Sequence, residues 1–196
     1  QPDPHHYDLL ASEARLASII AIGLGQVPVK HWFHLRRPVA HLRGGTTLLS
    51  WSGTMFEYLM PPLFTRSFPG TLLGRSADVV VERQMKYAHR LKVPWGISES
   101  AFALCDNQGH YQYRAFGVPG IGLKRGLPDD LVIAPYASSL AVNEHPDAVA
   151  DNLERLRKLG AGGQYCAVQA IYFTLGRRAE DGAVTVGYAC SGHRQG

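Results

Sequence analysis

The chain has 196 residues, of which 45% are hydrophobic and 18% are charged, so it can bury a core and is not a disordered tail. A formal net charge of +4, with isolated basic pairs at residues 36–37 and 177–178, argues against a nucleic-acid-binding protein. Three cysteines without CxxC spacing argue against a disulfide scaffold or a zinc knuckle. No apolar run reaches the ~18 residues of a membrane span, so we expect a soluble piece.

Apolar residues at helical spacing predict four main helices, near residues 7–24, 50–60, 72–91 and 146–159. In the first of them, Leu9, Leu16 and Ile20 share one face. The last begins at a proline and ends at a glycine, as helices commonly do. The prediction is a mainly α fold in a single domain or a fragment of one, because no domain boundary is evident.

Two other segments lack helical periodicity. Glycine, proline and aromatic residues crowd together between residues 93 and 126, and a long irregular segment inside a compact domain is usually functional. Weak alternation after residue 165 predicts short strands around a turn at 180–182.

Three glutamates stand in apolar or aromatic surroundings and are candidates for chemistry. Glu13 lies on the apolar stripe of the first predicted helix, where a carboxylate must be paired, hydrogen-bonded or protonated. Glu57 precedes a proline in an apolar block, and Glu99 lies in the irregular segment between two serines. The alternatives are a buried Glu–Arg pair for Glu13, backbone capping for Glu57 and a loop-organising role for Glu99.

Aromatic residues accompany these carboxylates along the chain. Aromatic rings stack on sugars, and paired carboxylates provide the acid and the nucleophile or base of glycosidic cleavage. The aromatic candidates are Trp51, Trp95, Tyr111, Tyr113 and Phe116. We expect no metal and no cofactor, because His31 and His34 lack a third ligand and the glycine-rich stretch 117–122 lacks a GK[ST] motif.

Six motifs in a fixed order carry a specific resemblance. They are YDLLASEARL at 7–16, VPVKHWF at 27–33, SWSGTMFEYLMP at 50–61, PWGISES at 94–100, YQYRAFGVPG at 111–120 and DDLVIAPY at 129–136. Over about residues 7–160 the chain closely resembles the glycoamylase-like, transglycosylating (cyclising) domain of bacterial cyclic β-1,2-glucan synthases.

The resemblance implies an (α/α)6 toroid that closes linear β-1,2-glucan into a ring by retaining transglycosylation. It assigns Glu99 as the nucleophile and Glu13 as the acid/base. Glu57 becomes a supporting carboxylate near the substrate. The other substrate-binding residues that we expect are Trp51, Trp95, Tyr113, Arg114 and Phe116.

The resemblance also implies a much larger parent protein. That parent lies in the bacterial inner membrane with this domain facing the cytoplasm, has a glycosyltransferase upstream and a phosphorylase-like region downstream, and binds a β-1,2-glucan chain. The chain holds about half of the helices of a toroid, so we expect a partial toroid with a few short strands. Its exposed helix faces would contact the remaining domains or form a homo-oligomer.

The match weakens after residue 160, where Gln169 replaces an acidic residue. A non-catalytic carbohydrate-binding fragment and an α-helical interaction module with buried salt bridges therefore remain as alternatives.

Overall fold

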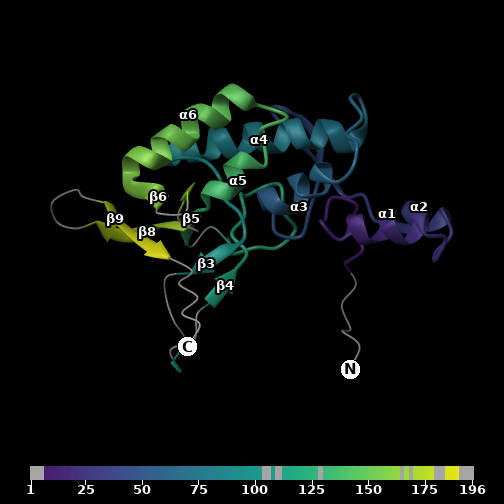
Figure 1. Cartoon of the computed structure of the whole chain (residues 1–196), viewed down its shortest axis with the longest axis horizontal. Coiled ribbons are helices and arrows are strands. Elements are labelled where there is room, and N and C mark those ends of the chain that lie inside the picture. The colour runs from purple at the N-terminus through teal and green to yellow at the C-terminus, as the bar shows by residue number, and fades with distance from the viewer. Residues whose placement is uncertain are drawn as a thin grey trace.

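The computed structural model describes residues 7–102, 107–108, 112–127, 130–163, 166–167, 170–178 and 184–189. Figure 1 shows helices along the upper side and at one end, with short strands below them and at the other end. This helix-rich arrangement with a few short strands confirms the mainly α prediction, and the toroid remains a prediction. None of the helices in these ranges is both long and apolar enough to cross a bilayer. Tyr111 and Gln169 lie outside the described residues.

The longest helix, α4 (Leu72–Leu91), has the predicted bounds. The side chain of Thr71 accepts a hydrogen bond from the backbone N–H of Gly74 (3.2 Å) and so caps its start. Lys92 ends it in the left-handed conformation, with φ of 58°. The buried face of α4 packs against β2 (Gly45–Leu48) and α3 (Met55–Leu59). Local capping and apolar periodicity therefore agree along this helix.

The first helix is shorter than predicted, since α1 (Arg15–Gly23) begins at residue 15 and not at residue 7. Leu10 donates its backbone N–H to the Arg36 carbonyl (2.9 Å), and Arg36 donates its own to the Asp8 carbonyl (2.7 Å). This pairing draws residues 8–10 alongside a distant segment, and the chain turns before α1 starts. The prediction that Glu13 lies on a helix was wrong, because Glu13 is in that turn.

The next elements complete the N-terminal half. The short helix α2 (Lys30–His34) follows α1, and β1 (Val39–Leu42) forms an antiparallel hairpin with β2. The helix predicted at 50–60 is confined to α3, followed by the 3₁₀ turn η1 (Pro61–Leu63). Residues 50–54 form a loop instead.

Antiparallel strands and two helices make up the C-terminal half. The sheet has the order β5 (Leu131–Ile133), β8 (Ala170–Arg178), β9 (Val184–Ala189), which confirms short strands after residue 165. The turn predicted at 180–182 lies outside the described residues. Two small pairs are β3 (Ser100–Phe102) with β4 (Gln112–Arg114), and β6 (Gly162–Gly163) with β7 (Cys166–Ala167). Helix α5 (Pro135–Ser139) precedes α6 (Pro146–Leu156), which ends earlier than the predicted residue 159, at a π-helical turn (Arg157–Ala161).

The start of the irregular segment after α4 is buried, and side chains from the helices satisfy its backbone. Gln84 of α4 exchanges two hydrogen bonds with Ile97: its Nε2 donates to the carbonyl (2.8 Å), and its Oε1 accepts from the N–H (3.0 Å). From α6, Asn152 accepts from the Trp95 N–H at its Oδ1 (3.0 Å) and donates its Nδ2 to the Trp95 carbonyl (2.8 Å). The chain is therefore held firmly until it emerges at Glu99.

Candidate active site

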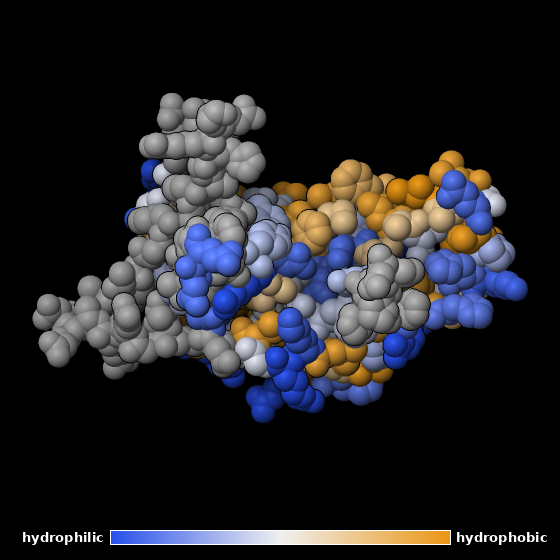
Figure 2. Space-filling view, turned by 90° about the horizontal axis from the view of Figure 1, so that it is seen from below, coloured by the Kyte–Doolittle hydropathy of each residue, from blue (hydrophilic) through white to orange (hydrophobic). Residues whose placement is uncertain are grey.

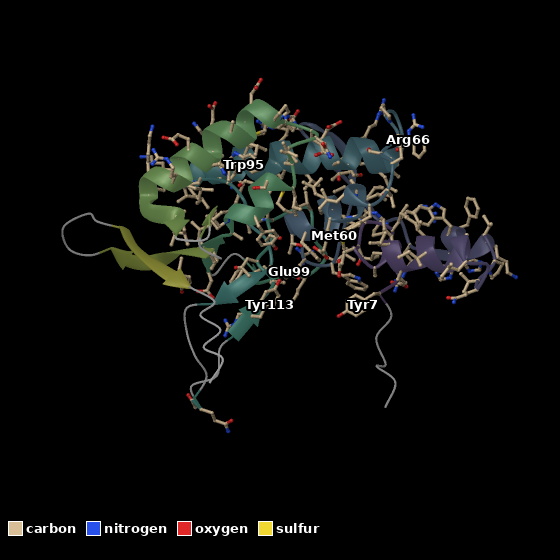
Figure 3. All side chains as sticks on the ribbon, in the orientation of Figure 1. Tyr7, Met60, Arg66, Trp95, Glu99 and Tyr113 are labelled. Carbon is tan, nitrogen blue, oxygen red and sulfur yellow. The ribbon has the colours of Figure 1, made fainter. Side chains whose placement is uncertain are left out.

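Glu99 lies directly after this buried segment and directly before β3, with its side chain half-buried. Figure 3 shows it near Tyr113 at the lower side of the molecule. Burial, with the charges of Glu13 and Glu57 as smaller causes, raises the pKa of Glu99 to about 7. The fold therefore brings Glu13 and Glu57, the other two glutamates singled out in the sequence, within electrostatic range of Glu99.

Glu13 is held in the turn before α1 and is partly buried. The hydroxyl of Ser12 donates to its Oε2 (3.0 Å). The buried Arg15 ties this turn to the end of α3, because its guanidinium donates to the carbonyls of Ser12 (3.0 Å), Glu57 (3.0 Å) and Tyr58 (2.7 Å). Burial lowers the pKa of Arg15 to about 10, and the charge of Glu13 opposes that change. The hydrogen bonds of Arg15 thus fix the backbone that carries Glu13.

Glu57 is 2% exposed, and its carboxylate organises the loop before α3. Its Oε1 accepts from the backbone N–H groups of Trp51 (2.9 Å) and Ser52 (3.0 Å). Its Oε2 accepts from the Ser50 hydroxyl (2.8 Å) and from the backbone N–H of Thr54 (2.9 Å). With Thr54 it forms a capping box at the start of α3. The alternative expected for Glu57, a carboxylate that bonds backbone amides at a helix end, is what the structure contains.

The aromatic candidates separate into core and surface residues. Trp95 and Phe116 are 7% and 2% exposed and belong to the hydrophobic core, so neither offers a face on which a sugar could stack. Figure 3 shows Trp95 near α4 and α6, well above Glu99. Sequence alone could not separate the two kinds, because aromatic residues fill cores as readily as they line sugar sites.

The remaining candidates are more accessible. Tyr113 is 58% exposed, and Arg114 pairs with Asp130 at 3.7 Å. Trp51 is half-buried, and its indole Nε1 is buried without a hydrogen-bond partner among the described residues. Tyr113 and Arg114 are the expected substrate-binding residues that present the most surface.

Two residues near Glu99 were not predicted as part of the site. Tyr136, at the second position of α5, donates its hydroxyl to the backbone carbonyl of Glu99 (2.7 Å) and lies 3.1 Å from the Ser98 Oγ. Ser98 in turn accepts from the backbone N–H of Phe56 (3.0 Å). Both residues belong to motifs that carry the family resemblance, at 94–100 and 129–136. Membership of these motifs is the sequence signal that could have identified them as site residues.

An apolar groove with a volume of about 660 Å³ lies between α1, α2 and the start of α4. Ile19, Val29, Trp32, Phe68 and Leu72 are among the residues that line it, and none of the three glutamates does. Figure 2, which shows the molecule from below, has polar residues in a hollow near the middle of the face and apolar patches beside them. The groove is an apolar surface of the kind expected of a partial toroid, and a homo-oligomer through it remains a prediction.

Metal ligands are not clustered in the described part of the chain, where no group of three or more His, Cys, Asp and Glu residues could hold an ion. The side chains that surround Glu99 in the described site carry carboxylate, hydroxyl and guanidinium groups.

Comparisons with known proteins agree with the motifs. The glycoamylase family model, described as "Putative glucoamylase", matches residues 5–190. The cyclic beta-(1,2)-glucan synthase NdvB of Rhizobium meliloti (strain 1021) is 51% identical over 168 residues, which cover 86% of this chain and 6% of that protein. The chain thus spans a small part of the length of this relative. The resemblance predicted from the six motifs is confirmed, and the chain belongs to the glycoamylase family.

Proposed function

We propose that this chain is part of a cyclic β-1,2-glucan synthase and cyclises linear β-1,2-glucan by retaining transglycosylation through Glu13 and Glu99. The observation that carries the proposal is the half-buried carboxyl of Glu99, whose pKa rises to about 7 beside the charge of Glu13. Two carboxyls with different environments, close enough to affect each other, are the equipment that glycosidases use.

In this mechanism one carboxylate attacks the anomeric carbon as the other, protonated, gives its proton to the departing glycosidic oxygen. This attack forms the covalent glycosyl-enzyme. The second carboxylate then accepts the proton of a sugar hydroxyl from the same glucan chain. That hydroxyl attacks the anomeric carbon, releases the first carboxylate and closes the ring. A retaining reaction predicts carboxyl groups about 5–5.5 Å apart, whereas about 6.5–9.5 Å would indicate an inverting enzyme.

The motif match gives Glu99 the role of nucleophile and Glu13 that of acid/base. A pKa of about 7 for Glu99 is the property of a general acid, because such a group is still protonated near neutral pH. The pair therefore supports two orders of roles, and trapping of the glycosyl-enzyme distinguishes them: the residue that carries the sugar is the nucleophile.

Substrate contacts in this proposal come chiefly from the accessible side chains. Tyr113 offers an exposed ring close to Glu99, and Arg114 offers a guanidinium for sugar hydroxyls. Glu57 acts indirectly, because its oxygens are already used by the loop 50–54. The remaining domains of the parent, its inner-membrane location and the cytoplasmic side of this domain are part of the same proposal.

The decisive experiment replaces Glu13→Gln and Glu99→Gln separately in the full-length parent and measures cyclisation of linear β-1,2-glucan. Each change should lower kcat by orders of magnitude and leave glucan binding intact. Glu82→Gln is the matched control, since this partly exposed residue on α4 pairs with Lys86 and is not among the charges that act on Glu99. Activity within a few-fold of wild type in either site variant would refute the pair. Glucan binding without turnover in the unmodified protein would favour a non-catalytic carbohydrate-binding fragment.

A further inference from the structure

Tyr136 lies next to the proposed catalytic residue Glu99 and binds its backbone through the phenolic hydroxyl. It stands on α5 and is half-buried. Its Oη is 2.7 Å from the Glu99 carbonyl oxygen and 3.1 Å from the Ser98 Oγ. A carbonyl oxygen only accepts, so the phenolic proton goes to Glu99, and Ser98 is left to donate to the phenol.

The hydroxyl completes a chain of hydrogen bonds that crosses from α3 to α5. The backbone N–H of Phe56 donates to Ser98 Oγ (3.0 Å), Ser98 reaches Tyr136, and Tyr136 reaches the Glu99 carbonyl. Successive hydroxyls in such a chain polarise one another, so each bond supports the next. Residues 98 and 99 are thus fixed between two helices that are far apart in the sequence.

The backbone just before Glu99 is also held on both sides. Met55 donates its N–H to the Ile97 carbonyl (3.3 Å), and Ala134 donates to the Gly96 carbonyl (2.9 Å). A Cβ on Gly96 would lie 2.7 Å from Ser138 Oγ, which shows how closely this segment approaches α5. The hydrogen bond from Tyr136 to the Glu99 carbonyl follows those to the Gly96 and Ile97 carbonyls along the chain.

The phenol keeps its proton over the pH range in which an enzyme is assayed. Burial raises the pKa of Tyr136, and the nearby Tyr113 and Glu99 raise it as well. The group therefore remains a donor to the Glu99 carbonyl at any working pH, and it contributes no titration of its own to an activity profile.

We infer that Tyr136 is a positioning residue for Glu99: its hydroxyl holds the Glu99 backbone so that the carboxyl stays half-buried beside Glu13. This inference rests on the proposed function, since it assigns Tyr136 a task only if Glu99 reacts. Within the described part of the chain, the titratable groups near Glu99 include Glu13 from the turn before α1 and Glu57 from α3, whose charges act on it, and Tyr136 from α5 and Tyr113 from β4.

The test is Tyr136→Phe in the full-length parent, which keeps the ring and removes the hydroxyl. A carboxyl that moves out of place should lower kcat about 10- to 100-fold, with KM changed less than about threefold. Because burial is the main cause of the raised pKa of Glu99, a freer carboxyl should also titrate lower, and the limb of the kcat/KM profile near pH 7 should move to more acid pH. Ser98→Ala, which breaks the same chain one bond earlier, should move the limb in the same direction.

Tyr87→Phe is the matched control, because it removes the hydroxyl of another buried tyrosine, on α4, and leaves the contacts of Glu99 described above in place. Its kcat and the limb of its kcat/KM profile near pH 7 should stay unchanged. If Tyr136→Phe and Ser98→Ala both keep the wild-type limb and kcat, the inference is wrong. If Tyr136→Phe fails to fold, an unshifted limb in Ser98→Ala overturns it alone. The Glu99→Gln variant distinguishes failure of the proposed function from failure of the positioning role. Full activity of Glu99→Gln would refute the proposed function. If Glu99→Gln is inactive and Tyr136→Phe keeps the wild-type pH profile and kcat, only the positioning role is refuted.

Discussion

Replacing Glu57 by Gln should unfold the loop before α3 and destabilise the whole protein. The carboxylate of Glu57 accepts at both oxygens, with Trp51 and Ser52 donating to Oε1 and Ser50 and Thr54 donating to Oε2. A glutamine side chain presents one oxygen and one NH₂ group. Whichever way the amide is turned, its NH₂ faces at least one backbone N–H, which can only donate: those of Trp51 and Ser52 at Oε1, or that of Thr54 at Oε2.

The size of the effect follows from this count of donors. With the glutamine oxygen at the Oε2 position, the Ser52 N–H keeps an acceptor, because it also donates to that oxygen (3.2 Å), but the N–H of the partly buried Trp51 loses its acceptor. An unsatisfied buried N–H costs about 1–3 kcal/mol. A domain of this size loses roughly 2–4 °C in Tm for each kcal/mol, which predicts a fall of roughly 2–12 °C.

Thermal unfolding followed by circular dichroism measures this change directly. Glu82→Gln provides the control, because it removes a carboxylate from an exposed i,i+4 pair with Lys86, and such pairs contribute less than about 1 kcal/mol. A Glu57→Gln protein that melts within about 2 °C of wild type would show that the carboxylate does not hold the loop.

Two further predictions concern stability. Glu99→Gln should raise Tm more at pH 8 than at pH 4.5. The folded-state pKa of about 7 exceeds the unfolded value, so the stability that the protonated carboxyl contributes is present below about pH 4.5 and is lost as the pH rises through 7. The uncharged amide of glutamine does not titrate, so the variant does not lose this stability at high pH. An equal effect at both pH values, in melts at fixed ionic strength, would contradict the raised pKa. Gly117→Ala should destabilise by about 3 kcal/mol or prevent folding, because the new Cβ would lie 1.7 Å from the Ser52 carbonyl oxygen. Gly23→Ala, with no atom within 4 Å of the added Cβ, should be neutral, and an equal loss of Tm in both variants would refute the packing argument.

Several features of this protein follow from local sequence. Helix α4 has the predicted bounds because apolar periodicity, a threonine N-cap and a left-handed C-cap all act over a few residues. Glu57 combined a capping-box pattern with an apolar helix, so its alternative as a capping residue was available from the sequence. The family was also accessible, because six ordered motifs identify it without any knowledge of the fold.

Other features were decided only by tertiary structure. The apolar spacing around Leu9 fits a helix, but the hydrogen bonds between residues 8–10 and Arg36 pull that segment into a paired strand-like path and leave Glu13 in a turn. Burial of Trp95 and Phe116 depends on neighbours that are distant in the sequence, so aromatic identity could not tell core from sugar platform.

The site itself belongs to this second class. Glu13, Glu57 and Glu99 are separated by dozens of residues, and each was conspicuous only as a carboxylate among apolar neighbours. Their mutual influence arises because Arg15 ties the turn of Glu13 to the end of α3, and Tyr136 ties Glu99 to α5. Electrostatic coupling depends on distance in space, and sequence separation says nothing about that distance until the chain has packed.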